Sequence, residues 1–244
     1  MIELPEILDG RDRSILLLAD HASNRVPGDI DLGIAPDLLG THIAWDIGTD
    51  ALARELARLF DSPAVIATIS RLVIDLHRDP QHAGLVPTVS DGHAIPGNVD
   101  ADIPARIARF HAPHHDCIDR LRRRHAPDLI VALHSFTPVL KSAPAPRPWE
   151  VGLLYNRDDR AARIAIDWLK ERGHVVGDNQ PYSGRLLNAT QDRHAEAHGI
   201  PYLTIEIRND LIADAAGVAR WAAILRAMIV DVRNRVAQTP PPAT

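Results

Sequence analysis

Apolar runs that lead into a histidine occur twice along this 244-residue chain. The first run spans 14–20 and is followed by His21, and the second spans 128–135 and carries His134 close to its end. Short apolar runs are typical of core strands, although periodicity alone does not exclude a buried helix. Open α/β sheets bind their ligands at the carboxyl ends of their strands. The two histidines therefore predict one site that is built from two strand ends.

Segments in which apolar residues recur at helical spacing alternate with further short apolar runs. The expected helices span 45–60, 103–125, 160–172, 189–198 and 213–236. The expected strands span 14–20, 64–69, 72–77, 128–135, 151–155, 174–176 and 202–208. This alternation predicts an α/β fold with a largely parallel or mixed sheet.

The connecting segments add two expectations. The expected strands 64–69 and 72–77 are too close for a crossover helix, so they predict a hairpin or one bent strand. The irregular segment 79–102 has a length that is typical of a functional or mobile loop. The proline-rich stretch 137–149 is too short for a domain linker, so we expect a single domain over 1–244.

Composition narrows the class of protein. The formal net charge of -5 disfavours nucleic acid and anionic membranes as general partners. The single cysteine excludes an intrachain disulfide and a cysteine-based zinc site. No signal peptide is visible, and no segment approaches the roughly 18 consecutive apolar residues of a membrane span. We therefore expect a cytoplasmic protein, whose oligomeric state the sequence leaves open.

The two strand-end histidines are candidate metal ligands. Imidazole is a common zinc ligand, and catalytic zinc sites combine three protein ligands with water. Asp46 and Asn24 are candidates for the third ligand beside His21 and His134. We prefer Asp46, because a carboxylate binds zinc far better than an amide. A place in the first turn of the following helix, favoured by the helix dipole, is the alternative interpretation of Asp46.

A glutamate in the expected strand 202–208 is the candidate general base. Thr204, Glu206 and Arg208 alternate with apolar residues and so share one face of the strand. Burial of a carboxylate is costly unless it is paired, and it raises the carboxyl pKa toward the range of a base. The alternative interpretation is an ion pair between Glu206 and Arg208 on a solvent-facing sheet.

Charged residues surround and interrupt the apolar run 72–77. Arg71 and Arg78 are candidates for binding a substrate carboxylate or a developing oxyanion. Asp75 is expected to orient one of these arginines. His111, His114 and His115 have helical spacing that could bind a metal, but a solvated helix face is the expected interpretation.

Several short motifs, taken together in order, resemble the N-formylglutamate amidohydrolase (N-formylglutamate deformylase) family over nearly the whole chain. The matching motifs are HASNRVP at 21–27, WDIG at 45–48, SR at 70–71, DLHR at 75–78, LHS at 133–135, PYSG at 181–184 and EIRNDL at 206–211. The family is similar in fold to zinc carboxypeptidases and aspartoacylases. The resemblance implies a three-layer α/β/α sandwich with a mixed, largely parallel sheet and one zinc ion, another divalent metal being possible.

The resemblance also implies roles for individual residues. His21 and His134 match the metal histidines of the family, Asp46 matches the acidic position taken as the third ligand, and Glu206 matches the catalytic glutamate. Arg71 and Arg78 match arginines that polarise the scissile carbonyl and bind the substrate carboxylate in the aspartoacylase relatives.

One position departs from the family pattern. His77 stands where the family commonly has an asparagine that donates to the substrate carboxylate. A histidine can also donate, but it is larger and titrates near neutral pH. His77 is therefore a further candidate for binding the substrate carboxylate. Arg208 is another candidate for the same role.

The resemblance predicts a zinc-dependent amidohydrolase that acts on a small-molecule N-acyl amino acid. N-formyl-L-glutamate, cleaved to formate and L-glutamate as in histidine degradation, is the preferred substrate, with Glu206 as base and Arg71 stabilising the oxyanion. Another N-acyl amino-acid hydrolase or a zinc carboxypeptidase-like enzyme is the alternative. A protein that binds a metal or an amino acid without catalysis is the alternative from a different class.

Overall fold

The computed structural model describes residues 2–238 and places seven strands in one twisted sheet. These strands are β1 (Glu6–Leu8), β2 (Ile15–Ala19), β3 (Ala64–Ile66), β6 (Leu129–Phe136), β7 (Val151–Leu154), β8 (Val176–Asp178) and β9 (Tyr202–Arg208). Their spatial order is β1-β3-β2-β6-β9-β7-β8. The central strands β3, β2, β6 and β9 are parallel, whereas β1 and β7 run antiparallel to their neighbours β3 and β9. The sheet is therefore mixed, as the alternation of elements predicted.

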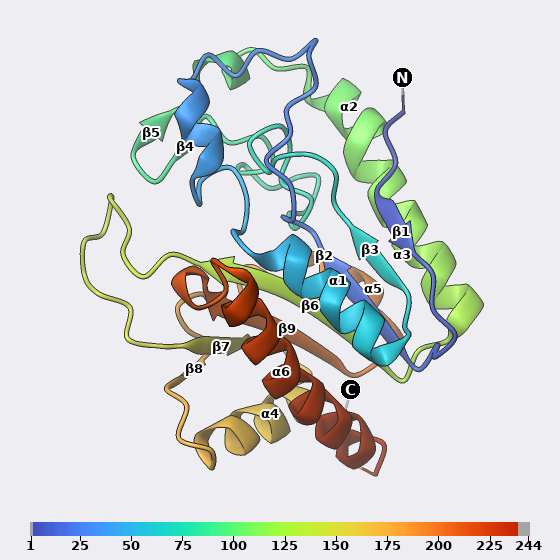
Figure 1. Cartoon of the computed structure of the whole chain (residues 1–244). Coiled ribbons are helices and arrows are strands. Elements are labelled where there is room, and N and C mark those ends of the chain that lie inside the picture. The colour runs from blue at the N-terminus through green and yellow to red at the C-terminus, as the bar shows by residue number, and fades with distance from the viewer. Residues whose placement is uncertain (1, 239–244) are drawn as a thin grey trace.

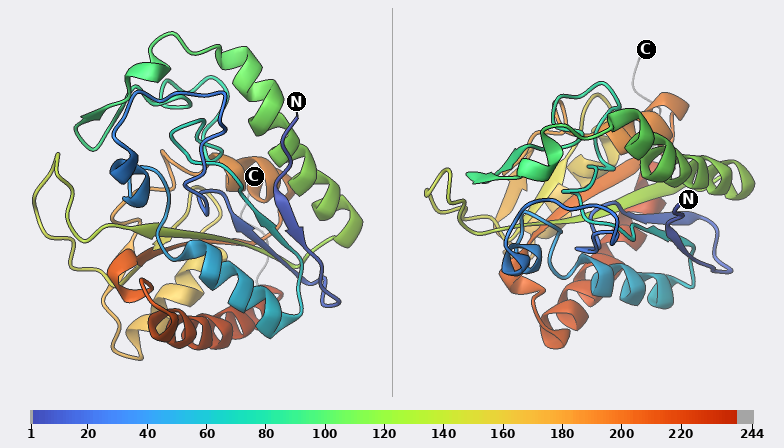
Figure 2. Two further views of the ribbon diagram at one scale, coloured as in Figure 1. Left: turned by 45° about the horizontal axis from the view of Figure 1, so that its top comes forward. Right: turned by 90° about the horizontal axis from the view of Figure 1, so that it is seen from above.

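Helices cover both faces of this sheet (Figures 1 and 2). The longer helices are α1 (Thr49–Phe60), α3 (Ala112–His125), α4 (Arg160–Lys170) and α6 (Ala215–Val236). The short helical segments are α2 (Ile103–Arg106), α5 (Ala189–His194), a π turn at Ile107–His111, and 3-10 turns at Pro36–Gly40, Pro96–Asn98, Glu196–His198 and Asn209–Leu211. Helices α1, α4 and α6 pack on one face, and α3 and α5 pack on the other. The result is the predicted three-layer α/β/α sandwich.

The two faces divide the buried residues of each strand. Leu17 and Ala19 of β2 belong to the larger core under α1, α4 and α6. Leu16 and Leu18 belong to the smaller core under α3. Because successive side chains of a strand point to opposite faces, a run that is apolar at every position is the pattern of a strand buried on both sides.

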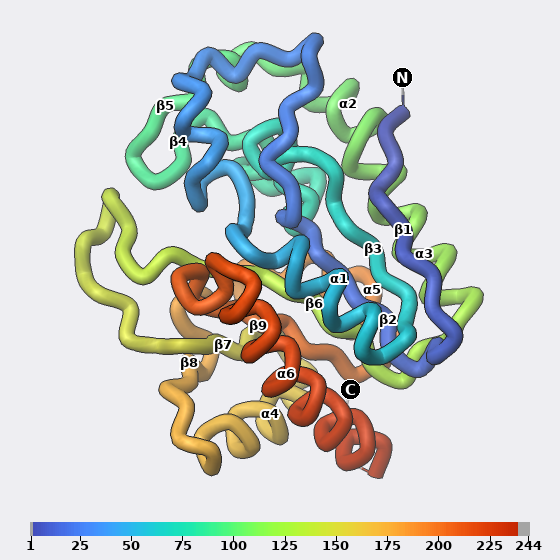
Figure 3. Tube along the Cα trace, viewed as in Figure 1, coloured from blue at the N-terminus to red at the C-terminus, as the bar shows by residue number. Residues whose placement is uncertain are grey.

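Long connections gather at the end of the sheet where β2, β3 and β6 finish (Figure 3). They include residues 20–48, 67–102 and 137–150, and the second contains the hairpin of β4 (Val89–Ser90) and β5 (His93–Ala94). The first two connections are fastened together, because the Ser70 hydroxyl donates to Ala44 O at 2.7 Å and the Arg71 amide donates to the same oxygen at 3.2 Å. Figure 3 shows the hairpin beside the 3-10 turn of the first connection.

The predicted strand at 72–77 was wrong. This segment forms consecutive turns, in which the Val73 amide donates to Ser70 O and the Asp75 amide donates to Leu85 O. Its apolar side chains are nevertheless buried, with Val73, Ile74 and Leu76 packing against Leu85, Val86 and Phe110 in a core of their own. The apolar run therefore predicted the burial of these side chains correctly but predicted the wrong secondary structure. A loop whose side chains form part of a core is as apolar as a buried strand.

All five predicted helices have somewhat different bounds in the structure, and two of the differences concern residues discussed as site candidates. The helix predicted from residue 45 begins at Thr49, after Gly48 adopts a φ of 88° that favours glycine. Asp46 therefore lies in the turn before the helix rather than in its first turn, so that alternative interpretation of Asp46 was wrong. The helix predicted over 103–125 contains the π turn at Ile107–His111 between its two α-helical parts.

The remaining differences are at the sheet edges and strand ends. Strand β1 lies in a segment for which no strand was predicted, and it pairs with β3, so that Ile7 is opposite Val65. Strand β3 ends at Ile66, three residues before the predicted end. Within residues 2–238, no helix has the length and apolar character that crossing a membrane requires.

Candidate active site

Three parallel strands bring the predicted site residues to one edge of the sheet. His21 follows the end of β2, His134 lies near the end of β6, and Glu206 lies near the end of β9. The register of β6 and β9 pairs His134 directly with Glu206. Residues opposite each other on neighbouring strands point to the same face, so these two side chains are lateral neighbours. The predicted meeting of two histidine-bearing strand ends is confirmed.

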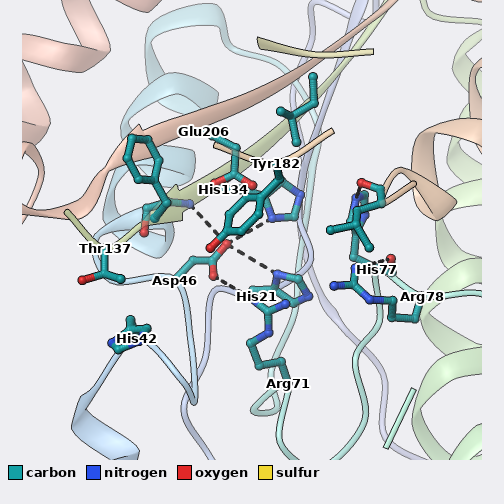
Figure 4. A pocket seen from close by; sticks show the side chains of 14 residues that line it. His21, His42, Asp46, Arg71, His77, Arg78, His134, Thr137, Tyr182 and Glu206 are labelled. Carbon is teal, nitrogen blue, oxygen red and sulfur yellow. Dashed lines mark hydrogen bonds and ion pairs between the residues drawn. The ribbon is translucent and has the colours of Figure 1, made fainter. Parts of the chain in front are cut away.

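Asp46 reaches both histidines from the connection after β2 (Figure 4). Its Oδ2 lies 3.1 Å from His134 Nδ1 and 3.4 Å from His21 Nδ1. Two hydrogen bonds from main-chain amides position Asp46. The Asp46 amide donates to His21 O at 2.9 Å, and the Ser135 amide donates to the side-chain oxygen Asp46 Oδ2 at 3.2 Å. Candidate ligand atoms of the three residues lie within 4.8 Å of one another, and all three residues are buried.

The tautomer of His21 indicates whether His21, Asp46 and His134 can bind a metal ion. Its Nε2 lies 2.7 Å from Asp75 Oδ1, so Nε2 donates a hydrogen to that carboxylate. In a neutral ring, Nδ1 then carries the lone pair, and Nδ1 is buried without a hydrogen-bond partner while it faces Asp46. A carboxylate behind a histidine is the arrangement that fixes the tautomer and raises the basicity of a metal-ligating imidazole. Two imidazole nitrogens and one carboxylate oxygen fit zinc or a similar divalent ion.

Charges around His21 favour a cation at this position. Burial and the Arg71 guanidinium oppose a charged ring, but the carboxylates of Asp75 and Asp46 raise the pKa of His21 to about 9. Burial also opposes the ionisation of Asp46, but the neighbouring His21 and His134 hold the pKa of Asp46 well below its ordinary value. A divalent ion would therefore bind in competition with a proton on His21.

Arg71 and Asp75 form the next layer of the site. Arg71 donates to Asp46 Oδ1 at 3.2 Å and to Asp75 Oδ2 at 2.9 Å. Asp75 therefore orients both Arg71 and His21, one with each carboxylate oxygen. Burial opposes a charge on Asp75, but His21, Arg71 and Arg78 hold the pKa of Asp75 well below its ordinary value.

Glu206 is buried with one unpaired oxygen. The residue is 6% exposed, and its Oε2 has no hydrogen-bond partner. Burial, opposed by the proximity of His134, raises the pKa of Glu206 to about 7. The alternative interpretation of a solvent-facing pair with Arg208 is wrong, because Glu206 is buried and Arg208 forms its ion pair with Asp210 at 2.8 Å. A carboxyl group that titrates near neutral pH suits a general base.

A cavity of about 120 Å³ opens beside these groups. It is lined by His21, His42, Asp46, Arg71, His77, Arg78, His134, Ser135, Phe136, Thr137, Leu154, Tyr182, Leu187 and Glu206. Seven of the eight predicted site residues are in this lining, and Arg208 is the one that is not. Figure 4 shows Arg71 and Arg78 approaching the cavity from below and from the side, in the orientation of that view. A second cavity of about 350 Å³ shares His42, Arg71, Arg78 and Tyr182 with the first.

Sequence reasoning assigned no site role to two polar residues of the cavity wall that have hydrogen-bond partners in other loops, Tyr182 and His42. Tyr182 belongs to a motif that carries the family resemblance, but no role was predicted for it, and its hydroxyl accepts a hydrogen bond from Arg147 at 3.1 Å. His42 lies 2.9 Å from Asp91 of the turn between β4 and β5. For His42 the sequence offers no signal, because the contact joins two loop residues that are far apart along the chain.

The prediction that His111, His114 and His115 form a solvated helix face was wrong. Each of the three is at most 2% exposed. His115 Nε2 donates to Leu76 O at 3.0 Å, so its Nδ1 accepts a hydrogen bond from His194 Nε2 of α5 at 2.8 Å. The charged run at 120–125 suggested an exposed helix face, but this run occupies the last turns of α3. The three histidines lie instead in the first turn of α3 and in the π turn before it, where the loop that carries Arg78 covers them.

Comparison with known proteins gives a family match over most of the chain. The model of the N-formylglutamate amidohydrolase family matches residues 13–213. No curated protein matches the sequence.

Two solved structures resemble the whole molecule. The gene product Atu2144 from Agrobacterium tumefaciens is 31% identical, with a TM-score of 0.89 over 96% of this chain and 97% of that one. N-formylglutamate amidohydrolase from Ralstonia eutropha JMP134 is 21% identical, with a TM-score of 0.74 over 98% of this chain and 100% of that one. At 21% identity, the similarity to the second structure shows a shared fold.

Proposed function

This chain belongs to the N-formylglutamate amidohydrolase family, and we propose that it uses one divalent metal ion, zinc by preference, to hydrolyse an N-acyl amino acid. N-formyl-L-glutamate, giving formate and L-glutamate, is the substrate that we propose first. The observation that supports this most strongly is the buried group of His21, Asp46 and His134, with the unpaired Glu206 carboxyl beside it.

The three buried residues would hold the ion through His21 Nδ1, His134 Nδ1 and an oxygen of Asp46. When bound, a divalent ion lowers the pKa of water and polarises a carbonyl group. Asp75 would keep His21 in the tautomer that leaves Nδ1 free for the ion.

Glu206 would act as the general base and then as the general acid. Its carboxylate accepts a proton from the attacking water, and the water oxygen bonds the formyl carbon. The carboxyl group then passes this proton to the leaving nitrogen as the C–N bond breaks, which gives a carboxylic acid and a free amine. In the metal-free protein, burial raises the pKa of Glu206 to about 7, a value at which a carboxyl group both accepts and donates a proton near neutral pH.

The arginines would supply the positive charge for the substrate. Arg71 is placed to stabilise the oxyanion, because it lines the cavity and is held by Asp46 and Asp75. Arg78, which also lines the cavity, would bind a substrate carboxylate. Arg208 is the weakest of the proposed carboxylate ligands, since it is outside the cavity lining and paired with Asp210.

The proposal is tested by measuring amine and carboxylate release from N-formyl, N-acetyl and dipeptide substrates. Protein stripped by a chelator is expected to lose hydrolysis and to regain it with zinc, and N-formyl-L-glutamate is expected to have the highest kcat/KM. His21→Ala should abolish both the bound metal and the reaction. Full hydrolysis by metal-stripped protein or by His21→Ala would refute the proposal. Tight amino-acid binding with no turnover in the presence of zinc would instead favour a non-catalytic binding protein.

A further inference from the structure

A second buried carboxylate lies behind the proposed metal group. Asp20, the residue after β2, is 1% exposed. Its Oδ2 lies 3.0 Å from His77 Nδ1, and its Oδ1 lies 2.9 Å from His114 Nε2. Within residues 2–238, these two imidazoles are the hydrogen-bond partners of the Asp20 side chain. Burial of a carboxylate is strongly unfavourable without a nearby positive charge, which a protonated imidazole or a bound metal ion supplies here.

The second nitrogen of His77 indicates where that cation belongs. Both nitrogens of His77 face acceptors, because Nδ1 lies 3.0 Å from Asp20 Oδ2 and Nε2 lies 3.3 Å from Leu187 O. A neutral ring carries one N–H, so when Nε2 donates to Leu187 O, Nδ1 directs a lone pair at the Asp20 carboxylate. Two acceptors 3.0 Å apart are held together by a proton or by a metal ion between them. That distance suits two neighbouring ligands of an ion whose bonds are about 2.1 Å long.

His134 completes a possible set of ligands. The register of β2 and β6 places Leu18 opposite Ala132, and two residues further along the strands Asp20 and His134 share the same face. The rings of His77 and His134 are 4.7 Å apart between centroids, and candidate ligand atoms of Asp20, His77 and His134 lie within 4.8 Å of one another. In Figure 4, His77 lies across the His21–His134 pair from Asp46.

The free nitrogen of His134 is the second observation that points to a ligand. His134 is 2% exposed, and its Nδ1 is 3.1 Å from Asp46 Oδ2. Its Nε2 is buried and has no hydrogen-bond partner. A buried imidazole nitrogen without a partner costs free energy, which a bound cation would offset.

We propose that Asp20, His77 and Nε2 of His134 bind a second divalent cation, so that His134 bridges two ions. The site takes a first-row ion such as Zn²⁺ or Co²⁺, because its donors are two imidazoles and one carboxylate. Bridging converts the imidazole of His134 to an imidazolate, and the ring proton passes to solvent. The second ion neutralises Asp20 and fixes the orientation of His134. This inference extends the proposed function, because the first ion would share His134.

The test is the number of ions bound by full-length protein. Chelator-stripped protein is dialysed against excess Zn²⁺ or, separately, Co²⁺, freed of loose metal, and analysed by plasma mass spectrometry. We expect about two ions per chain for the wild type and about one for His77→Asn and for Asp20→Asn. One ion per chain in the wild type that His77→Asn leaves in place, or two ions in both variants, overturns the proposal. Circular dichroism of each variant checks that a loss of metal is not a loss of folding.

Two further variants separate this proposal from the first. Asp46→Asn removes a ligand of the first site alone, so we expect about one ion, which is lost on adding His77→Asn. If the first site does not exist, Asp46→Asn leaves the metal content unchanged, whereas His77→Asn still lowers it. His198→Asn, an exposed position, is the matched control and should retain both ions. Loss of an ion there, with none lost in His77→Asn, would identify surface binding and overturn the second site.

Discussion

Asp46 contacts three groups that are positive or can become so: the rings of His21 and His134 and the guanidinium of Arg71. Asp75 adds a second carboxylate, which also contacts Arg71 and lies 3.9 Å from Arg78. The two carboxylates therefore balance the two arginines before any ion is counted. With Glu206 ionised as the base, a divalent ion would still leave these groups with a net positive charge, which suits an anionic substrate such as an N-acyl dicarboxylic amino acid.

Glu206 offers a direct test of the proposed proton transfers. Glu206→Gln preserves size and hydrogen bonding but cannot accept a proton. We expect it to retain the bound metal and to lose at least about a hundredfold in kcat. Metal analysis combined with steady-state kinetics measures both quantities. Wild-type kcat in this variant would remove Glu206 from the mechanism, whereas loss of the metal would indicate that Glu206 is a ligand.

Substitution of Asp75 tests whether the residues that orient the proposed metal ligands affect metal binding. Asp75→Asn removes the charge that orients His21 through Nε2 and that pairs with Arg71. We expect the affinity for zinc to fall by about 10–100-fold, because partners behind ligating histidines contribute this much in metal sites. Competition with a chromophoric chelator measures the affinity. Asp79→Asn, at an exposed position four residues along, is the control and should bind zinc like the wild type. Equal affinity in the two variants would contradict the role of Asp75.

At the level of elements, strands and loops contribute different parts of the site. The ends of β2, β6 and β9 fix His21, His134 and Glu206, because the sheet sets the spacing of neighbouring strands. Asp46 and Arg71 come from two loops instead. Those loops hold each other through hydrogen bonds to Ala44 O. The position of the loops therefore determines whether Asp46 meets the strand-borne histidines.

Gly48 is the position where this loop geometry is most constrained. Its φ is 88°, and a Cβ built there would lie 2.3 Å from Ile212 O. We expect Gly48→Ala to lower the free energy of unfolding by at least about 2 kcal/mol, since it adds left-handed strain to a backbone collision. It should also weaken zinc binding, because Asp46 is two residues away. Urea denaturation and metal titration are the measurements.

The matched control for Gly48 is a glycine in the same connection. Gly28→Ala adds a Cβ that meets no atom within 4 Å, so its stability should change by less than about 0.5 kcal/mol. If Gly48→Ala is as stable as Gly28→Ala, the turn before α1 is not the constraint that places Asp46.

Across the whole molecule, the sequence predicted what depends on local pattern and missed what depends on distant contacts. Strand β9 has the predicted bounds, because its alternation and flanking residues are local signals. The contact of His21 with Asp75 joins residues 54 positions apart, and no pattern reports it. The burial of His115 was missed for a related reason. Helical spacing groups residues on a face, but only the packing of α3 against α5 decides which face is buried.

The buried histidines behind the site should make the stability of the metal-free protein depend on pH. Burial lowers the pKa of His194 to about 3 and the pKa of His115 well below its ordinary value. In the unfolded chain these rings have pKa values near 6.5, so between about pH 4.5 and 6.5 the unfolded state binds more protons than the folded state. Stability is therefore fully present above that range and falls as the pH decreases, by about 1.4 kcal/mol per pH unit for each such histidine. Glu206, whose pKa is raised to about 7, acts in the opposite direction between about pH 4.5 and 7, so in this window it offsets the contribution of about one histidine. His21, whose pKa is raised to about 9, also acts in the opposite direction, but only between about pH 6.5 and 9, above this window. Urea denaturation at several pH values measures the slope, and His194→Gln should lower it by the contribution of one histidine. An unchanged slope in that variant would mean that His194 is protonated in the folded protein.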